Sequence, residues 1–449
     1  MLHSRDFDTP ALDDIEFRQH YERTLKRSTQ LRHRRTRRWA AGVSAALACL
    51  LAVGLVAASL GATTPKRPTI AGSPTHRTTW RLVSEVALAG SSWRELSPSG
   101  YKQTFSLVCP TGTTCYADST GGQLEYTHDG GSTWKRASSI GTATLLTRIS
   151  CVDARDCDVL TDNTGRGSTF LTTTDGGQRW TSHRGPALQN LSNGGVTNDV
   201  MSCATISSCA VIAYHGDSSG SFSEAFTTSD GGASWSQGTI PSLPSGQFVP
   251  TGLSCSGTTC VAVGSAGIYG GASQGVDPHG GAAYTSNDGG ATWSASSAPP
   301  GTLTRSLTCP DAADCYAPSL AAVYQTKDGG QAWSRVSTSG LPGPSGSSSR
   351  WNFLHMTCAS SSSCWLSGAS SLPANPGSLR AFFSIGQAQG LLASTADGGA
   401  TWALSRLPAG VGGVADVTCP DTTTCFALGI KQTGSAPSDF KVVLLTNAS

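Results

Sequence analysis

Fourteen of the 15 cysteines fall in seven close pairs, and no other residue pattern in the chain points so directly to a chemistry. The pairs are Cys109/Cys115, Cys151/Cys157, Cys203/Cys209, Cys255/Cys260, Cys309/Cys315, Cys358/Cys364 and Cys419/Cys425. A zinc site needs four clustered ligands, and no histidine follows these pairs at ligand spacing. Residues opposed across an antiparallel hairpin lie within disulfide reach. We therefore predict one disulfide per hairpin and no metal, each disulfide stabilising its hairpin by about 2–2.5 kcal/mol.

An acidic turn of the form D-G-G-x-x-W recurs six times. Its aspartates and tryptophans are Asp129 and Trp134, Asp175 and Trp180, Asp230 and Trp235, Asp288 and Trp293, Asp328 and Trp333, and Asp397 and Trp402. The glycines can adopt the positive φ of a tight reversal, and the carboxylate can accept bonds from the amides of its own turn. The tryptophan starts the next strand and can bury its ring. Metal binding or catalysis is the alternative, but a turn that recurs in every unit favours a structural role.

The residues around each cysteine pair alternate as in a half-buried strand. A large apolar residue lies two positions before each first cysteine, and the intervening position is small or polar in six of seven cases, Val108 being the exception. The second cysteine is expected to open the next strand. Each unit is then read as strand, cysteine hairpin, strand, loop, strand, DGG turn and strand. First cysteines recur every 42 to 61 residues. Four-stranded units of this length predict an all-β fold, a seven-bladed β-propeller.

Seven cysteine pairs accompany only six complete DGG turns, so one blade must be assembled from both ends of the repeat region. Trp93 lies 16 residues before Cys109, a spacing of 16 or 17 that three later units share. We predict that "SSWREL" around Trp93 is a fourth strand and that "FKVVLLTNAS" (440–449) is the third strand of the same last blade. Such a closure removes exposed sheet edges.

A membrane anchor is predicted ahead of the propeller. Residues 39–62, "WAAGVSAALACLLAVGLVAASLGA", hold no charged side chain and are long enough to span a bilayer as a helix. The basic run "RHRRTRR" before them predicts a cytoplasmic N-terminus and an extracytoplasmic propeller at the plasma membrane. A cleaved signal peptide is the alternative. The expected organisation is a basic cytoplasmic segment (1–38), a signal anchor (39–62) in contact with membrane lipid, a linker (63–79) and the propeller (80–449).

Charge argues against a nucleic-acid partner. Residues 1–38 carry ten Lys/Arg against six Asp/Glu, a balance of +4, whereas residues from Trp80 onward carry 18 against 23, a balance of −5. Phosphate binding needs a clustered basic face, which a mildly acidic body does not provide. No motif for a cofactor is present, so none is predicted.

The DGG turn resembles the Asp-box, or BNR, repeat of sialidase-type propellers, and also the repeats of photosystem II assembly-factor-like propellers and sortilin-type receptors. The resemblance implies a propeller whose Asp boxes lie away from its ligand face. Sialidase chemistry would require an arginine triad, a tyrosine nucleophile with its glutamate and an aspartic acid. The R-I-P motif of that family is absent, and Arg148 in "TRIS" follows the first box instead of preceding it. Among the extracellular glutamates only Glu224 is a plausible candidate, so no catalytic residue is predicted.

Long loops on the side opposite the cysteine hairpins are the predicted ligand face, since such loops often hold binding residues. Its candidates are Tyr269, Asp277, His279, Arg350, Trp351 and Arg380. A second group of polar residues is expected to line the central channel as solvated side chains: Arg148, His355, Asp416, Asp199 and Arg305. The leading hypothesis is a non-enzymatic module that binds an extracellular protein or glycan. The alternatives are a sialidase-like exo-glycoside hydrolase and a sensor ectodomain that signals through the single helix.

Overall fold

The computed structural model describes 14 segments of the chain, all of them in its larger compact unit, Pro74–Ser449. They are residues 78–86, 105–119, 123–137, 145–163, 167–188, 196–217, 220–244, 246–269, 276–299, 306–319, 322–341, 350–371, 389–434 and 440–448. The predicted cytoplasmic segment 1–38 and anchor 39–62 lie outside the described residues, as do residues 63–77 of the linker. The part of the chain that is described contains no helix long and apolar enough to span a membrane.

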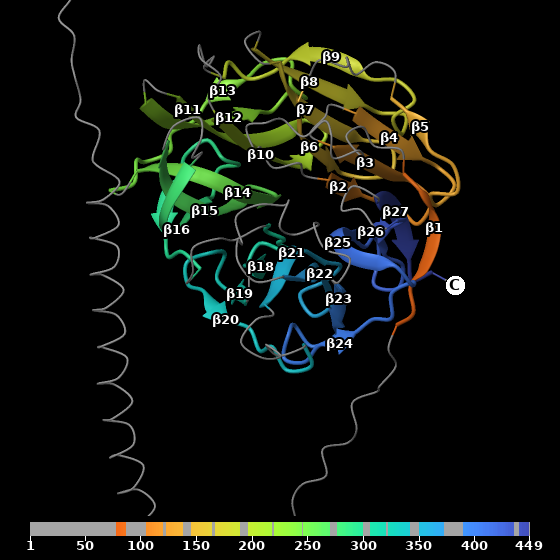
Figure 1. Ribbon diagram of the computed structural model, residues 1–449. Helices are drawn as coiled ribbons and strands as arrows, with labels where there is room; N and C mark the ends of the chain where they lie inside the picture. Colours follow the sequence, from red (N-terminus) through yellow and green to blue (C-terminus); the bar gives the residue numbers. More distant parts are fainter. Residues whose placement is uncertain are drawn as a thin grey trace, which may run out of the picture. The chain divides into compact units, whose positions relative to one another are not determined.

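Seven antiparallel sheets form a ring, as the sequence predicts, and Figure 1 shows them arranged around a common centre. Numbered from the first cysteine pair, blades one to three are β2 (Phe105–Val108), β3 (Cys115–Ser119), β4 (Gln123–Thr127) and β5 (Lys135–Arg136); β6 (Leu145–Cys151), β7 (Cys157–Asn163), β8 (Gly167–Thr173) and β9 (Thr181–Arg184); and β10 (Val196–Thr205), β11 (Ser208–Asp217), β12 (Gly220–Thr228) and β13 (Ser236–Gln237).

The remaining blades repeat this order with different strand lengths. They are β14 (Gln247–Ser256), β15 (Thr259–Tyr269), β16 (Val276–Ser286) and β17 (Ser294–Ser296); β18 (Cys315–Pro318), β19 (Val323–Thr326) and β20 (Ser334–Arg335); β21 (Arg350–Cys358), β22 (Cys364–Ser371), β23 (Gly390–Thr395) and β24 (Ala403–Leu404); and β25 (Val411–Thr418), β26 (Phe426–Gln432), β27 (Phe440–Thr446) and β1 (Arg81–Glu85). In the fifth blade, the bridge between Thr308 and Tyr316 takes the place of an inner strand.

Each blade is buried on both faces because blades pack face to face around the ring. In β11, Ile212 contributes to the apolar cluster shared with Phe248 of the fourth blade, whereas Val211 contributes to the cluster shared with Leu160 of the second. Successive side chains of a strand point to opposite faces. Both sets must therefore be apolar, which explains runs such as "CAVIAY" at the second cysteine of each unit.

The ring is closed by an N-terminal strand, but not by the one predicted. β1 pairs antiparallel with β27, with Glu85 opposite Val443, and thus supplies the outermost strand of the last blade. Trp80 stands directly before β1, as each DGG tryptophan stands directly before the outer strand of its own blade. The prediction that "SSWREL" forms this strand is wrong, and Trp93 itself lies outside the described residues.

The propeller also begins slightly earlier than predicted. Arg406, after β24 of the sixth blade, donates its N–H to the carbonyl of Thr78 at 2.9 Å and accepts from Trp80 N at 2.9 Å. The indole of Trp80 packs edge-on against Trp365, with ring centroids 5.2 Å apart. Thr78 and Thr79, expected in the linker, therefore already belong to the folded ring and join its sixth and seventh blades.

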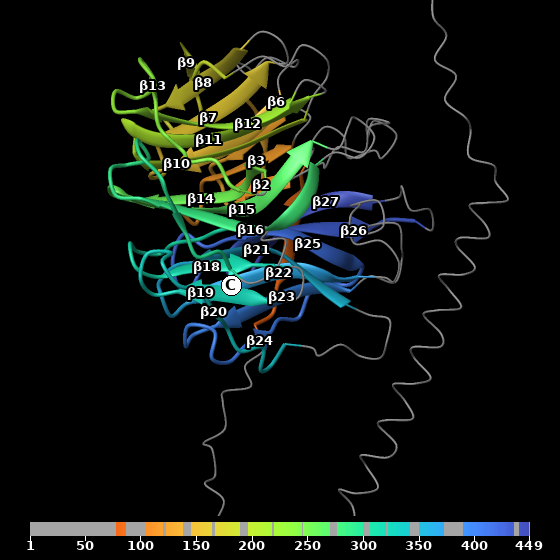
Figure 2. The ribbon, with the colours of Figure 1, turned by 90° about the vertical axis from the view of Figure 1, so that its left-hand side faces the viewer.

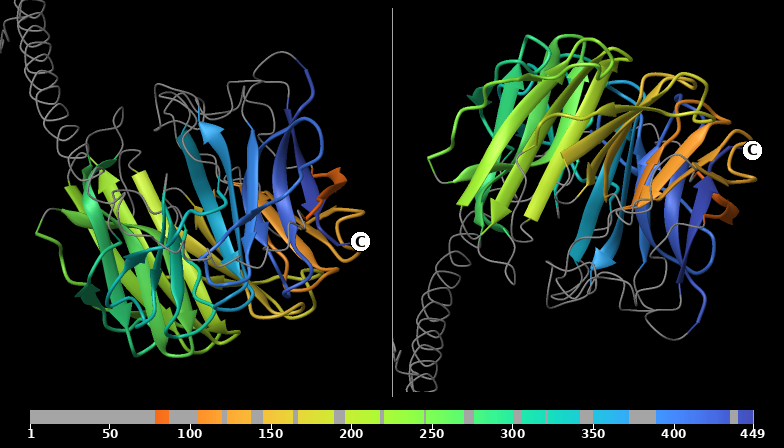
Figure 3. Two further views of the ribbon diagram at one scale, coloured as in Figure 1. Left: turned by 90° about the horizontal axis from the view of Figure 1, so that it is seen from below. Right: turned by 90° about the horizontal axis from the view of Figure 1, so that it is seen from above.

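The third and fourth blades have the longest strands. β10 to β12 and β14 to β16 span 9 to 11 residues each, whereas β18 and β19 of the fifth blade span four. Figure 2 shows β15 and β16 as the long pair of the fourth blade, and in Figure 3 the long green strands of these two blades run side by side. Because strand length varies in this way, the blades extend to different distances on the side of the ring opposite the cysteine hairpins.

Candidate functional site

The six DGG aspartates are held inside their own turns. Asp129 illustrates the arrangement: its Oδ1 accepts from Thr127 Oγ1 at 2.7 Å and from Thr133 N at 2.8 Å, and its Oδ2 accepts from Thr133 Oγ1 at 2.6 Å. In all six turns, Oδ1 accepts the backbone N–H of the residue before the tryptophan. The Thr133 hydroxyl first, and then its backbone N–H, lower the pKa of Asp129 to about 2. These hydrogen bonds favour the ionised form of a carboxyl that braces its turn.

Each complete turn is also tied to the cysteine hairpin of its blade. The N–H of the first glycine donates to the carbonyl two residues before the second cysteine, at 2.8 to 3.0 Å in all six blades. The six bonds are Gly130 to Thr113, Gly176 to Arg155, Gly231 to Ser207, Gly289 to Thr258, Gly329 to Ala313 and Gly398 to Ser362. Hairpins and DGG turns therefore lie on one side of the ring, and one backbone hydrogen bond joins them in each of the six blades.

All seven predicted disulfides are present, one at the hairpin of each blade. The first cysteine is half-buried in six of the seven pairs. The second cysteine is at most 2% exposed in every blade: Cys115, Cys157, Cys209, Cys260, Cys315, Cys364 and Cys425. Each bridge therefore fixes the end of the two inner strands from within the core.

The fourth hairpin departs from the prediction that the second cysteine opens the next strand. β15 begins at Thr259, so Cys260 is its second residue, and Ser256 still pairs with Thr259 beyond the disulfide. This hairpin is also the shortest of the seven, because Cys255 and Cys260 are five residues apart whereas the other pairs are six apart. Cys260 is 0% exposed and belongs to the apolar cluster around Tyr284. It is a core residue joined to Cys255 and not a surface site.

The prediction also fails by one residue in two other blades. β11 begins at Ser208, before Cys209, and β26 begins at Phe426, after Cys425. In the remaining four blades the second cysteine is the first residue of its strand, as predicted. The disulfide thus marks the hairpin in every blade, while the local backbone pairing decides where the ladder begins.

The seventh blade lacks a DGG turn, and the side chain of Asn447 replaces it. Its Nδ2 donates to the carbonyl of Thr423 at 3.1 Å, the position that a turn glycine bonds in the other blades, and its Oδ1 accepts from Cys425 N at 2.7 Å. Thr446, at the place of the threonine or serine that precedes each turn, donates to the carbonyl of Cys425 at 2.9 Å. One amide side chain thus satisfies the hairpin that the interrupted repeat leaves open.

Replacing Asn447 with alanine removes both hydrogen bonds. We expect the free energy of unfolding to fall by about 1–2 kcal/mol, since a typical net hydrogen bond contributes about 1 kcal/mol. Denaturant unfolding of the oxidised protein measures the change. Asn447→Asp keeps the Oδ1 acceptor but loses the donor and should lie between the two. A stability equal to wild type for Asn447→Ala would contradict this role.

The inner strands are joined to one another by side chains, because neighbouring blades share no backbone ladder. Ser150 Oγ accepts from Cys203 N at 3.2 Å, Ser202 Oγ accepts from Cys255 N at 3.0 Å, and Thr418 Oγ1 accepts from Cys109 N at 3.4 Å. All three hydroxyls occupy the position just before a first cysteine. The small or polar character of that position therefore reflects blade-to-blade bonding.

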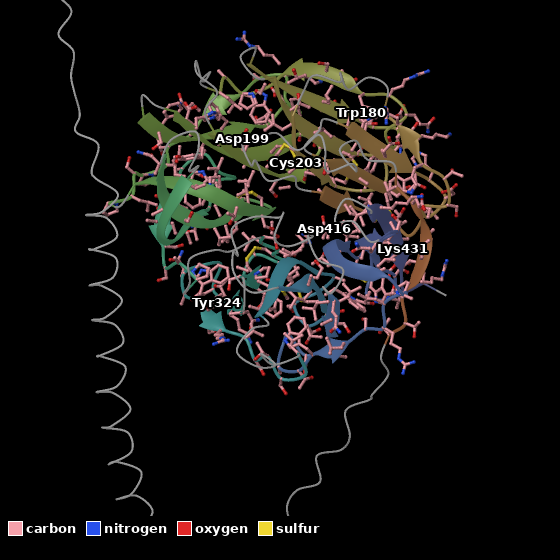
Figure 4. All side chains as sticks on the ribbon, in the orientation of Figure 1. Trp180, Asp199, Cys203, Tyr324, Asp416 and Lys431 are labelled. Atoms are coloured by element: carbon pink, nitrogen blue, oxygen red, sulfur yellow. A yellow bond between two sulfur atoms is a disulfide. The ribbon has the colours of Figure 1, made fainter. Side chains whose placement is uncertain are left out.

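Asp416 links three blades at the inner wall of the ring (Figure 4). Its Oδ2 accepts from Leu107 N of the first blade at 2.8 Å, and its Oδ1 accepts from Val417 N at 2.7 Å within the seventh. Oδ1 also lies 2.6 Å from Nδ1 of His355 in the sixth blade. Since the other neighbour of Nδ1, the carbonyl of Val417 at 3.2 Å, is also an acceptor, this nitrogen carries the hydrogen.

The expectation of solvated channel side chains is therefore wrong for Asp416, which is buried and bonded through both oxygens. The expectation is also wrong for Asp199, which is buried on β10, whereas His355 is partly exposed. Arg148 is described only through the backbone of β6, and Arg305 lies outside the described residues. The sequence places His355 and Asp416 at the same position relative to their first cysteines. It does not reveal that the Asp416 carboxylate accepts a hydrogen bond from the backbone of the next blade.

The predicted ligand face is described mainly through its backbone. Tyr269 and Asp277 are not in a loop: the β15–β16 ladder extends to Tyr269 opposite Val276, and His279 also lies within β16. Arg350 and Trp351 begin β21, with Arg350 opposite Ser371. These five positions lie at the ladder ends remote from the hairpins, on the fourth and sixth blades, in strands and not in the expected loops. Arg380 lies outside the described residues.

The glutamates do not assemble a hydrolytic site in the described part of the chain. Glu224, the one sialidase-like candidate, is buried on β12 and accepts from Gln237 Nε2 at 3.3 Å. Glu125 accepts from Arg136 Nε at 3.1 Å, and Glu85 pairs with Lys441 at 2.7 Å. Each of the three binds a side chain of its own blade, which is what a scaffold role requires.

His215 is buried against Phe222, with ring centroids 5.5 Å apart, and neither ring nitrogen has a hydrogen-bond partner among the described residues. Burial lowers its pKa from 6.5 to about 4. At pH values between these two, the unfolded chain binds the proton that the folded chain excludes.

We therefore expect the fold to lose stability as pH falls from about 6.5 toward 4, and His215→Phe to remove this loss. The difference should reach about 3 kcal/mol at the acid end, because one pKa unit corresponds to about 1.4 kcal/mol. Melting temperature measured against pH for the two proteins gives the comparison. If the two melting-temperature curves ran parallel between pH 6.5 and 4, His215 would not be the cause of the loss of stability.

Comparison with known proteins finds no matching family model and no matching curated relative. Solved structures do match. YCF48 bound to D1 peptide is 16% identical, with a TM-score of 0.49, and the match covers 86% of this chain and 98% of that chain. YCF48 from Cyanidioschyzon merolae is 15% identical, with a TM-score of 0.48, covering 82% and 98%. An ancestral GH74 enzyme is 11% identical, with a TM-score of 0.45, covering 81% and 47%.

Proposed function

We propose that this chain is a membrane-tethered, extracytoplasmic propeller that acts as a non-enzymatic binding module for a protein or glycan at the cell surface. One observation carries the proposal. The acidic residues that recur in the ring, six DGG aspartates and three glutamates, are bonded to turns and strands of their own blades. Acidic groups bonded in this way stabilise the scaffold, so we place ligand binding at the rim of the ring.

The proposed location rests on the uncharged stretch 39–62, the basic run before it and the disulfides after it. Disulfides persist in oxidising compartments and are rare in the cytosol. We also assign the DGG turns to the Asp-box type. In every turn the hydroxyl of a threonine, or of Ser286 in the fourth, accepts the N–H of the second glycine, and the aspartate accepts the N–H of the residue before the tryptophan.

The proposed binding face is the side remote from the hairpins. On the hairpin side, turn amides and hairpin carbonyls bond to each other. On the opposite side, the extended β15–β16 ladder carries Tyr269, Asp277 and His279, and β21 begins with Arg350 and Trp351. Aromatic and arginine side chains are enriched among the residues that dominate binding energies.

The test uses full-length protein in nanodiscs, applied to a glycan array and to cross-linking capture on intact cells. A rim variant replaces Tyr269, Asp277 and His279 with alanine. A control variant replaces Arg179 and Lys327, which are exposed on the DGG-turn side. We expect a saturable ligand whose retention drops at least tenfold in the rim variant and stays at the wild-type level in the control.

Three results would reject the proposal. Release of sugar from sialosides or other glycosides by the purified protein would favour a hydrolase. A ligand retained equally by rim variant and wild type would place binding elsewhere. Protease accessibility of the ring only after the cells are opened would reverse the proposed topology.

A further inference from the structure

A carboxyl group lies where the other blades are apolar. Asp158 follows the second cysteine of the second blade, in β7, and is 0% exposed. The equivalent residues of the other blades are Tyr116, Ala210, Val261, Tyr316, Trp365 and Phe426. Burying a carboxyl without a strong partner costs several kcal/mol, so its presence in this layer needs a physical reason.

A disulfide of the adjacent blade lies beside this carboxyl group. Asp158 Oδ2 lies 3.6 Å from Cys209 Sγ, and the Sγ atom of Cys203 belongs to the same cluster, whose ligand atoms all lie within 4.8 Å of one another. Oδ1 has no hydrogen-bond partner among the described residues. Burial first, and then the charge of Asp156, raise the pKa of Asp158 to about 7, which keeps its proton available near neutral pH.

Metal binding does not explain this cluster. Cys203 and Cys209 are joined to each other, and only free thiolates act as metal ligands. A carboxyl O–H, by contrast, can donate toward a sulfur atom, and it can give up its proton when that sulfur becomes a thiolate.

We propose that Cys203–Cys209 is a redox-active disulfide that reacts with a dithiol, and that Asp158 is the proton donor to the departing Cys209 sulfur. Cys203 is the half-buried member of the pair, on a hairpin whose Thr205 and Ser207 are exposed, whereas Cys209 is buried beside the acid. The geometry thus assigns attack to Cys203 and departure to Cys209 (Figure 4 labels Cys203).

In the first step, a thiolate of the dithiol attacks Cys203 Sγ, the S–S bond breaks, and its electron pair leaves on Cys209 Sγ, which takes the proton of Asp158. The second thiolate of the dithiol then attacks the mixed disulfide, releasing Cys203 as a thiolate and closing the dithiol into a cyclic disulfide. Cys203 and Asp158 each recover a proton from water. Two electrons pass from the dithiol to the protein, and stabilisation of the leaving thiol speeds such exchange.

The experiment treats the six sister disulfides as internal controls. Full-length protein in nanodiscs is reduced by a small dithiol at pH 6, quenched at intervals with an alkylating reagent and digested for mass spectrometry. We expect Cys203 and Cys209 to be labelled before any other pair. Asp158→Asn keeps the shape but cannot transfer a proton, and it should slow this pair by about a hundredfold, the lower end of general-acid effects.

Asp153→Asn is the matched control, since it removes an exposed carboxylate from the hairpin of the second blade and keeps an oxygen acceptor for the N–H groups of Arg155 and Asp156, and it should leave Cys203–Cys209 the first pair labelled. In Asp158→Asn the six sister pairs should react at wild-type rates, which would show that the ring is intact. Labelling of Cys203–Cys209 no faster than its sisters in wild type would overturn the proposal. So would an unchanged or faster reaction of that pair in Asp158→Asn.

Discussion

Replacing Gly232 with alanine is expected to lower the free energy of unfolding by about 3–5 kcal/mol. Gly232 is the second glycine of the third DGG turn and has a φ of 84°. A Cβ there would lie 2.2 Å from Cδ1 of Phe170, a fully buried ring of the preceding blade. Alanine therefore meets both an unfavourable backbone conformation and a collision within an apolar core.

Gly289→Ala separates the cost of the backbone conformation from the cost of the collision. This first glycine of the next turn has a similar φ of 73°, but a Cβ there would meet nothing within 4 Å. Only the backbone penalty of about 1–2 kcal/mol applies. Denaturant unfolding of both variants should therefore place Gly232→Ala well below Gly289→Ala. Equal losses would mean that the collision with Phe170 adds nothing to the backbone penalty.

The second large effect is expected at Asp416. Asp416→Ala leaves the buried N–H of Leu107 without its acceptor and removes the partner of His355. Because each unsatisfied buried group costs about 1–3 kcal/mol, and loss of one partner of a buried pair about 3–5 kcal/mol, we expect a loss of about 3–5 kcal/mol. Asp416→Asn retains an oxygen acceptor and should lose less.

Glu85→Gln provides the comparison within the same blade. Glu85 and Lys441 form an exposed pair, so removing its charge should change stability by no more than about 1 kcal/mol. Thermal and denaturant unfolding of the three variants tests the order. If Asp416→Ala were as mild as Glu85→Gln, Asp416 would not join the first, sixth and seventh blades.

Much of the ring could be predicted because its repeated signals are local. A cysteine pair specifies a hairpin, and D-G-G-x-x-W specifies both a turn and the strand after it, so seven blades follow from spacing alone. The same reasoning explains why the outer strand of the last blade was misplaced. Trp93 has the expected distance to Cys109, but Trp80, which no DGG sequence precedes, is the residue directly before β1. Strand pairing across the chain ends is decided by packing, not by local spacing.

The candidate site was less predictable for a related reason. The register of His355 and Asp416 could be read from their cysteines, but a contact with the backbone of Leu107 depends on how blades meet. Asp158 shows the same limit: the sequence places an acid after Cys157, and only the ring brings it to Cys209 of the next blade. Asn447 carried a usable signal, because it follows Thr446 where a seventh DGG turn would begin.

Closure of the ring by β1 is the central claim, since the two faces and their candidate residues depend on it. Lys441 Nζ lies 2.7 Å from Glu85 Oε2, close enough for a carbodiimide to join the amine and the carboxylate directly. Mass spectrometry of the coupled, digested protein should find the peptide of Glu85 linked to that of Lys441, and Lys441→Arg should abolish the link. A link from Lys441 to Glu95 in place of Glu85 would put the Trp93 segment beside β27 and contradict the account.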